Sequence, residues 1–253
     1  MLGKNRISTL RKLHQKKHRA EEKLFLAEGT KIVGELLRDA RLPIEVFALK
    51  SWIQDPENRS HQIGITEISE ADMERISTLV TPSEVLAVCR MPELKVLEHN
   101  DQSLILALDS VRDPGNVGTL IRLADWFGFD AVIASEDTVE WTNPKVIQAS
   151  MGSFLRLQPH YVRLKDFFQS HPDLPVIATE LSGENLYTSQ FQPKGCIILS
   201  NESRGLSEEL RLHVRKSLRI PAFYKSADGA ESLNVATAGA IILSEIARRR
   251  TLS

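Results

Sequence analysis

The chain has 253 residues and a formal net charge of -1 at pH 7, so a uniformly polybasic chain that attracts polyanions by charge alone is excluded. No apolar run approaches the roughly 18 residues of a membrane span, and the basic start lacks the apolar segment of a signal peptide. Cys89 and Cys196 lie inside apolar runs, as buried thiols do in proteins of a reducing compartment. We therefore expect a cytoplasmic protein. A disulfide between the two cysteines is the less favoured alternative.

Residues 4–23 are rich in lysine and arginine, and the apolar residues Ile7, Leu10 and Leu13 recur among them at helical spacing. This pattern predicts a short amphipathic helix. Its basic face has two interpretations, either a solvated surface or a set of phosphate contacts that gain affinity by releasing counterions.

Short strands and helices alternate over residues 24–90, which predicts a small α/β unit. Glu28 and Gly29 follow the first strand and indicate a turn rather than a site. The polar stretch 92–103 is typical of a linker, and we expect two domains, at residues 1–98 and 104–253.

The second domain begins with an apolar strand that ends at Asp109 and continues into a glycine-rich turn. Asn116 stands where a helix N-cap is expected, and the apolar spacing after it predicts a helix that carries Arg122 in its second turn. Further strands are predicted at 131–135, 153–162, 175–180, 196–200 and 218–220, and further helices at 144–151, 164–169 and 233–250. Because helices separate most of the strands, we expect a mostly parallel sheet of about six strands.

Three polar turns follow strands of this predicted sheet. They contain Asn116 with Arg122, Glu202 with Gly205, and Ser232 with Asn234. Taken alone, each residue is typical of a helix cap or a solvated turn. Taken together, an arginine, a glutamate and two amides at the carboxyl edge of one sheet indicate a polar pocket. Phosphate-binding glycine motifs, zinc ligand spacings and a hydrolase nucleophile motif are absent from the sequence.

These three stretches resemble the three motifs of the SpoU (TrmH-like) branch of the SPOUT RNA methyltransferases. The first family motif, Asn-x-Gly with a helical arginine, is matched by residues 116–118 and Arg122. The second, a glutamate turn that ends in glycine, is matched by residues 200–205. The third, Ile-Pro followed by Ser-Leu-Asn-Val, is matched by Ile220–Pro221 and residues 232–235. Residues 25–36 also resemble the family's ribosomal-protein-like N-terminal substrate-binding domain.

The resemblance implies an α/β fold with a mostly parallel sheet and a C-terminal trefoil knot, preceded by that small α/β domain. It also implies a homodimer that binds S-adenosylmethionine as its cofactor and transfers a methyl group to a ribose 2′-hydroxyl of rRNA or tRNA. No metal and no membrane are expected. The implied catalytic residues are Asn116, Arg122, Glu202, Ser232 and Asn234, and the implied cofactor-binding residues are Leu199, Ser200, Gly205, Ile220 and Leu233.

The chain departs from the family pattern in two places. Ser200 replaces the usual glycine and requires a negative φ there, and the loop 222–231 is longer than usual, with Phe223 and Tyr224 in it. These departures leave open an inactive RNA-binding protein that retains the fold. A small-molecule enzyme of doubly wound type is a third interpretation, and a purely structural Arg122–Glu202 ion pair is the alternative to a catalytic arginine.

Overall fold

The computed structural model describes residues 2–38, 43–58, 64–93, 97, 100, 102–201, 203–223 and 231–251. Glu202, Tyr224, half of the predicted linker 92–103 and most of the loop 222–231 lie outside this set. The chain forms two compact units, Met1–Glu93 with Glu140–Leu155 and Leu94–Val139 with Arg156–Ser253. Residues 140–155, which follow the predicted linker in sequence, thus pack within the N-terminal unit.

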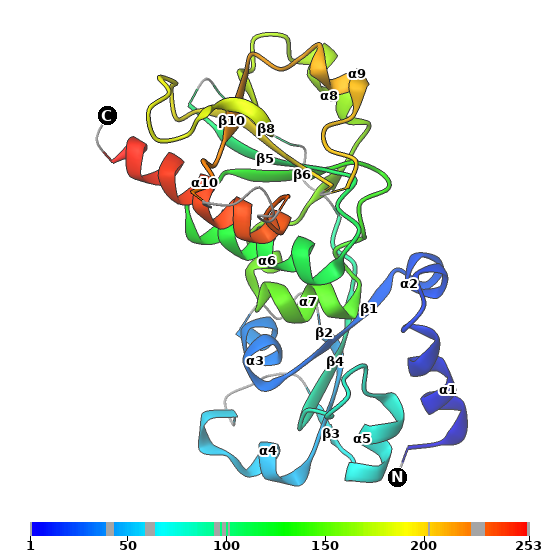
Figure 1. Ribbon diagram of the computed structural model, residues 1–253. Helices are drawn as coiled ribbons and strands as arrows, with labels where there is room; N and C mark the ends of the chain where they lie inside the picture. Colours follow the sequence, from blue (N-terminus) through cyan, green and yellow to red (C-terminus); the bar gives the residue numbers. More distant parts are fainter. Residues whose placement is uncertain are drawn as a thin grey trace. The chain divides into compact units, whose positions relative to one another are not determined.

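Unit 1 is a four-stranded sheet in the order β1-β4-β2-β3, with helices on both faces (Figure 1). The small α/β unit predicted from the sequence is therefore present. Its elements are α1 (Lys4–Lys12), α2 (Lys16–Glu22), β1 (Leu24–Glu28), α3 (Thr30–Arg38), β2 (Pro43–Ala48), α4 (Lys50–Gln54), a 3-10 turn (Pro56–Asn58), β3 (Ile65–Glu67), α5 (Glu70–Ile76), β4 (Val85–Arg90), α7 (Pro144–Ser150) and a second 3-10 turn (Ser153–Leu155).

The predicted basic helix is two helices, α1 and α2, separated by a short turn. Ile7, Leu10 and Leu13 are buried in one core cluster with residues of the sheet and of α5. Burial of this apolar face leaves the lysines and arginines of α1 on its outer side. On the other side of the unit, Phe25 of β1 meets Trp141 edge-on, with 5.2 Å between ring centroids, and Trp141 stacks on Phe154 at 5.6 Å.

Unit 2 is a six-stranded, fully parallel sheet in the order β10-β8-β9-β5-β6-β7, which confirms the predicted parallel sheet. Its elements are β5 (Leu104–Asp109), α6 (Pro114–Trp126), β6 (Ala131–Ala134), β7 (His160–Tyr161), α8 (Leu164–Ser170), β8 (Val176–Asn185), β9 (Gly195–Ser200), α9 (Glu208–Arg211), β10 (Lys216–Arg219) and α10 (Val235–Arg250).

Helices cover both faces of this sheet (Figure 1). Leu164 and Phe168 of α8 and Leu210 of α9 share a buried cluster with alternate residues of the strands. On the opposite face α6 and α10 pack against each other. Gly239 of α10 lies so close to α6 and β9 that a Cβ there would overlap the side chain of Leu120. The absence of a side chain at this position allows α10 to pack closely against α6 and β9.

Two local predictions are wrong. The N-cap of α6 is Asp113 and not Asn116, because Pro114 occupies the first helical position, where its fixed φ and missing N–H cost nothing. Residues 153–162 do not form one strand: they contain a 3-10 turn at 153–155, and only His160–Tyr161 pairs with the sheet. Pro159 immediately before that short strand cannot donate a ladder hydrogen bond.

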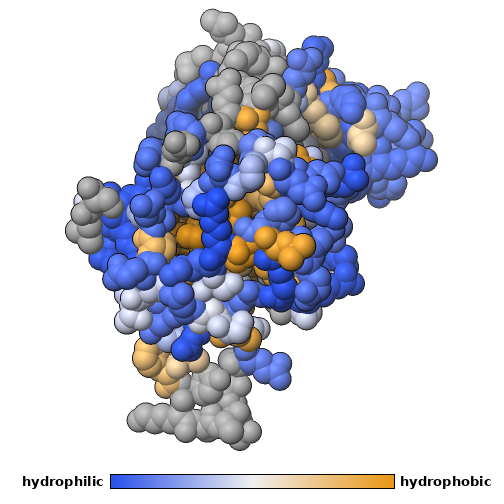
Figure 2. Space-filling model, turned by 90° about the horizontal axis from the view of Figure 1, so that it is seen from above, coloured by the Kyte–Doolittle hydropathy of each residue, from blue (hydrophilic) through white to orange (hydrophobic). Residues whose placement is uncertain are grey.

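Cys89 and Cys196 are free and buried, as predicted, and burial raises the pKa of each thiol. Figure 2 shows one face of the molecule, on which hydrophilic residues predominate and hydrophobic ones gather near the middle. Among the described residues, no helix is both long enough and apolar enough to cross a bilayer.

Glu245 ties the end of α10 to the rest of unit 2. Its carboxylate accepts hydrogen bonds from Nε of Arg248 at 2.7 Å and Nε of Arg249 at 2.8 Å, and Arg249 in turn donates to the carbonyl of Leu186. The bond from Arg248, with that from Arg249, outweighs the effect of burial and lowers the pKa of Glu245 to about 2.

We expect this interaction to make stability depend on pH. Because an unfolded glutamate has a pKa of 4.5, the stabilisation is present above that pH and is lost as the pH falls toward 2. Glu245→Gln should therefore lower the free energy of unfolding by about 2 kcal/mol near neutral pH and by almost nothing near pH 2. Urea unfolding of both proteins across this range measures the difference, and an equal loss at every pH would contradict the assignment.

Candidate functional site

The strand order places a topological switch point between β5 and β9. From β5 the chain continues outward to β6, whereas β9 borders β8 on the other side. Parallel α/β sheets bind ligands in the crevice outside the carboxyl ends of the strands at such a point. The loops that follow β5, β6 and β9 therefore define the region of interest.

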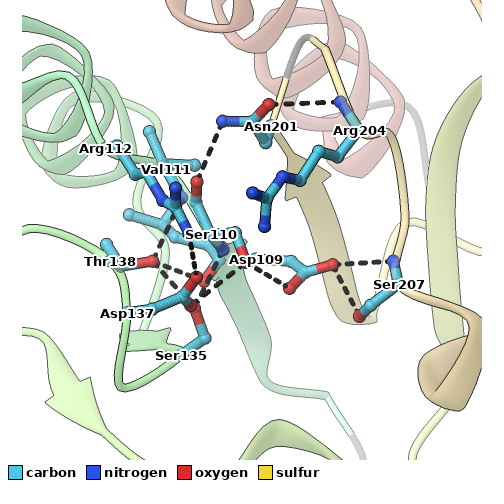
Figure 3. A network of polar contacts seen from close by, with 11 residues as sticks. Asp109, Ser110, Val111, Arg112, Ser135, Asp137, Thr138, Asn201, Arg204 and Ser207 are labelled. Carbon is cyan, nitrogen blue, oxygen red and sulfur yellow. Dashed lines mark hydrogen bonds and ion pairs between the residues drawn. The ribbon is translucent and has the colours of Figure 1, made fainter.

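A network of polar contacts joins these three loops (Figure 3). Asp109, buried at the end of β5, accepts hydrogen bonds from the backbone N–H and the hydroxyl of Ser207 at 3.0 and 2.9 Å. Ser110 adopts a left-handed φ of 58°, uncommon for a residue with a side chain, and its carbonyl accepts a bond from Nδ2 of Asn201 at 3.2 Å. This network fixes the start of the loop that leads to Asn116.

Asp137 in the β6 loop holds the same segment from the other side. It accepts hydrogen bonds from Ser135 at 2.8 Å and Ser110 at 3.0 Å and pairs with Arg112 at 3.1 Å. Burial raises the pKa of Asp137, but these hydrogen bonds outweigh burial and the pKa is lowered. None of these residues was predicted from the sequence, since an aspartate and serines after a strand give no signal beyond that of an ordinary turn.

A cavity of about 370 Å³ opens on the β9 side of this crevice. Its size lies within the roughly 300–1,000 Å³ of small-molecule sites, and its wall is mainly apolar with a few polar groups, as is usual for such sites. The lining residues are Thr179, Glu180, Leu181, Ser182, Leu199, Ser200, Asn201, Gly205, Leu218, Arg219, Ile220, Ser232, Leu233, Val235, Ala238 and Ile242.

One wall of the cavity comes from an excursion of β8. Ala178 is paired with Ser217 of β10 and Glu184 with Leu218, so the intervening residues 179–183 leave the ladder. Gly183 makes the return possible, because a Cβ there would lie 2.6 Å from the backbone of Leu218. An isolated glycine in a strand is the sequence signal for such a bulge.

Glu180 in this excursion is held by two neighbours. It pairs with Arg211 at 2.6 Å and accepts a hydrogen bond from Ser217 at 2.8 Å. Its carboxylate is thereby fixed at the wall of the cavity.

The turn predicted after β9 has the backbone that the site requires. Ser200 ends β9 in extended conformation, so the serine is accommodated without strain. Gly205 has a φ of 67° and donates its N–H to the carbonyl of Asn201 at 2.9 Å, which closes a turn at a conformation that favours glycine.

Asn234 has two functions at the start of α10. Its Oδ1 accepts the N–H groups of Ala236 and Thr237 at 3.0 and 3.2 Å, which makes it the N-cap. Its Nδ2 donates to Oδ1 of Asn116 at 3.1 Å and so connects the first and third motifs, which are 118 residues apart. The start of α10 is thus fixed with respect to the first turn of α6.

The predicted site residues fall into four groups. Six of them line the cavity, namely Leu199, Ser200, Gly205, Ile220, Ser232 and Leu233. Asn234 and Asn116 bond to each other next to it. Arg122 is exposed on α6, about 120° around the helix from Asn116. Glu202 lies outside the described residues.

Asn234→Asp separates these two functions of the side chain. The aspartate retains an oxygen for the cap but replaces the donor that faces Asn116 by a second acceptor. We expect the free energy of unfolding to change by less than about 1 kcal/mol, whereas the methyl transfer that the family resemblance implies should fall strongly. Asn234→Ala is the control, since it should lose about 1 kcal/mol or more through the missing cap. Urea unfolding together with a methyl-transfer assay tests this, and full activity in Asn234→Asp would show that the Asn116 bond is dispensable.

The site shows no grouping that would hold a metal. Across the described part of the chain, no three His, Cys, Asp or Glu side chains gather closely enough to do so. The cavity itself suits a ring system with polar edges, because its lining combines apolar side chains such as Leu199 and Ile242 with hydroxyl-bearing residues such as Ser232. The adenosyl part of S-adenosylmethionine has this chemistry.

Comparison with known proteins agrees with this geometry. The 23S rRNA (guanosine(2553)-2′-O)-methyltransferase RlmP of Bacillus subtilis is 31% identical over 94% of each chain. The 23S rRNA (guanosine-2′-O-)-methyltransferase RlmB of Pseudomonas aeruginosa is 27% identical over 98% of this chain and 96% of its own. The crystal structure of an AdoMet-bound rRNA methyltransferase from Sinorhizobium meliloti superimposes with a TM-score of 0.82 at 30% identity, covering 100% and 97% of the two chains.

Family models match both parts of the chain. An MRM3-like substrate binding domain matches residues 4–87. The SpoU rRNA Methylase model matches residues 103–244, which include all three motifs and the cavity. The chain therefore belongs to the SpoU rRNA Methylase family.

Proposed function

We propose that this protein transfers the methyl group of S-adenosylmethionine to a ribose 2′-hydroxyl of rRNA or tRNA. The observation that carries the proposal is the cavity, in which six motif residues from the two segments that follow β9 and β10 converge beside the Asn116–Asn234 pair. The relatives RlmP and RlmB, which are named as 23S rRNA 2′-O-methyltransferases, support the proposal. The alternative of an inactive RNA-binding protein gains no support from these relatives.

The reaction needs two things from the protein. A ribose hydroxyl is a weak nucleophile, so its oxygen must lie in line with the methyl carbon and its proton must leave as the new O–C bond forms. When bound, S-adenosylmethionine supplies an electrophilic methyl group on a sulfonium. Backbone groups near Leu199, Ser200, Ile220 and Leu233 would hold its adenosyl part, and Gly205 keeps the adjoining turn closed.

Arg122 would bind the RNA next to the reacting hydroxyl. A guanidinium has a pKa above about 12 and no acceptor, so it cannot serve as the base in its charged form. It can hold a phosphate and stabilise the charge that develops on the 2′-oxygen. Asn116 and Asn234 would orient the ribose, Ser232 would contact substrate or cofactor at the cavity wall, and Glu202 would fix the geometry through a charge-assisted bond.

The remaining parts of the proposal follow from the family. Residues 1–98 would bind the substrate RNA and residues 104–253 would carry out the transfer, in a cytoplasmic homodimer whose C-terminal segment forms the trefoil knot. Analytical ultracentrifugation tests the dimer, and a single sedimenting species of monomer mass at micromolar concentration would reject it.

The experiment that tests the function combines binding and transfer. At about 100 times its Kd, S-adenosylmethionine should stabilise the fold by about 2.7 kcal/mol. Cofactor labelled in its methyl group should then transfer the label to RNA from cells that lack this protein, and the product should resist alkaline cleavage at the modified ribose. Stabilisation without transfer to either rRNA or tRNA would reject the proposed reaction, and no stabilisation would favour a protein that only binds RNA.

A further inference from the structure

The outer side of α1 forms one wall of a basic groove in unit 1. The groove has a volume of about 510 Å³, and residues at positions 4, 8 and 11 recur along it at the spacing of one helix face. Arg75 of α5 lies on the opposite wall. The residues that define this α1 groove are Lys4, Ile7, Ser8, Arg11, Lys12, His14, Gln15 and Arg75.

The groove is held open by contacts at both ends. His14 shares a hydrogen bond through Nε2 with the carbonyl of Ile76 at 3.0 Å, which joins the end of α1 to the end of α5. At the other end the N–H of Leu2 donates to Oδ2 of Asp72 at 2.9 Å. Between them Leu10 is fully buried, so α1 cannot rotate to hide its basic side chains.

The charges in the groove differ from those on the adjoining helix. On α2, Lys16 and Arg19 pair with Glu140, and Lys17 lies 3.9 Å from Glu21. In contrast, the three cations that α1 contributes to the groove are exposed and, within the described residues, have no ion-pair partner. Arg75 has only a long contact of 3.8 Å to Asp72. Positive charge is therefore neutralised on α2 and left available in the groove.

We propose that the α1 groove binds the phosphodiester backbone of the substrate RNA, an inference that rests on the function proposed above. Lys4 and Arg11 are seven residues apart on the helix, which corresponds to about 10.5 Å along its axis, enough for the two side chains to contact different phosphates of one strand. Three lysine or arginine contacts with phosphates release about three counterions and impose a strong dependence of affinity on salt. The residues that line the groove include no Phe, Tyr or Trp for stacking on bases, and His14 is bonded to the carbonyl of Ile76, so we expect contacts with the backbone that are independent of sequence.

The test is a salt titration of RNA binding by the full-length protein. The probe is a fluorescein-labelled RNA hairpin with a single-stranded loop, and the variant is Lys4→Gln/Arg11→Gln/Lys12→Gln. Between about 50 and 200 mM salt, wild-type affinity should fall about 20- to 40-fold more than that of the variant. The matched control, Lys31→Gln/Lys50→Gln/Arg90→Gln, changes the net charge equally at exposed positions outside the groove and should retain the wild-type slope.

Further measurements keep the two proposals separate. Arg75→Gln alters the opposite wall alone. It should reduce the slope of log affinity against log salt concentration by about the amount expected for one phosphate contact. Equal slopes for wild type and groove variant would overturn the inference even if the wild type methylates RNA. Wild-type protein that binds RNA through the groove but transfers no methyl group would instead reject the function and leave the groove standing. If the groove variant lost more affinity for a polyglutamate peptide than for RNA, the groove would be assigned to an acidic protein and the inference would be overturned.

Discussion

Arg122→Ala is expected to abolish methyl transfer while the affinity for S-adenosylmethionine stays within about tenfold, or roughly 1.4 kcal/mol. The reason is the position of the side chain: Arg122 is exposed on α6 and does not line the cavity that would hold the cofactor. Its exposure on α6 makes the guanidinium accessible to a phosphate or to the reacting oxygen. Isothermal titration with cofactor and a methyl-transfer assay measure the two effects separately.

Two controls make this prediction specific. Arg122→Lys keeps the charge but loses the planar fork, and it should recover only part of the activity if two oxygens are contacted at once. Lys165→Ala removes an exposed cation on α8 and should leave transfer unchanged. Near-normal turnover of Arg122→Ala would remove this residue from the proposed mechanism.

Among substitutions of a glycine by alanine in unit 2, Gly195→Ala is expected to lower the free energy of unfolding the most. Gly195 begins β9 with a φ of 93°, and a Cβ there would overlap the carbonyl oxygen of Pro175. Backbone strain and overpacking together should cost about 3 kcal/mol or more in the free energy of unfolding. Because β9 leads to Leu199 and Ser200 at the cavity, activity should fall at temperatures below the melting transition as well.

Gly128→Ala is the matched control for this change. Gly128 has a φ of 69°, but nothing lies within 4 Å of the position where its Cβ would be. The alanine there should cost about 1 kcal/mol, from the left-handed backbone alone. Urea unfolding of both variants measures the difference, and equal losses would show that the contact with Pro175 relaxes freely.

Local patterns were sufficient to predict most of this fold. Apolar runs such as 104–109 identified the strands, and helices between them implied parallel pairing. Pro144 and Asn143 marked the start of α7 correctly, and the side chain of Asn143 does accept the N–H of Lys145. The six cavity residues were predicted because sequence motifs identified them, although no periodicity connects the loops that carry them.

What could not be predicted depends on contacts between distant segments. Phe25 and Trp141 meet in the core of unit 1, yet nothing near either residue indicates the other. The excursion of β8 is set by the backbone of Leu218, which lies outside its own sequence neighbourhood. Asp113 rather than Asn116 caps α6, since the choice between two adequate caps was decided by a neighbouring proline.

The excursion of β8 also has an evolutionary consequence. Residues of β8 pair with β10 both before and after this excursion. Residues 179–182 can therefore change in number or size without altering the order of strands in the sheet. Relatives could in this way enlarge or narrow the recess in which we propose that the adenosyl part of the cofactor rests, while the loops after β9 and β10 stay in place. Libraries randomised over this short segment are therefore a direct route to variants that accept cofactor analogues with a larger adenosyl part.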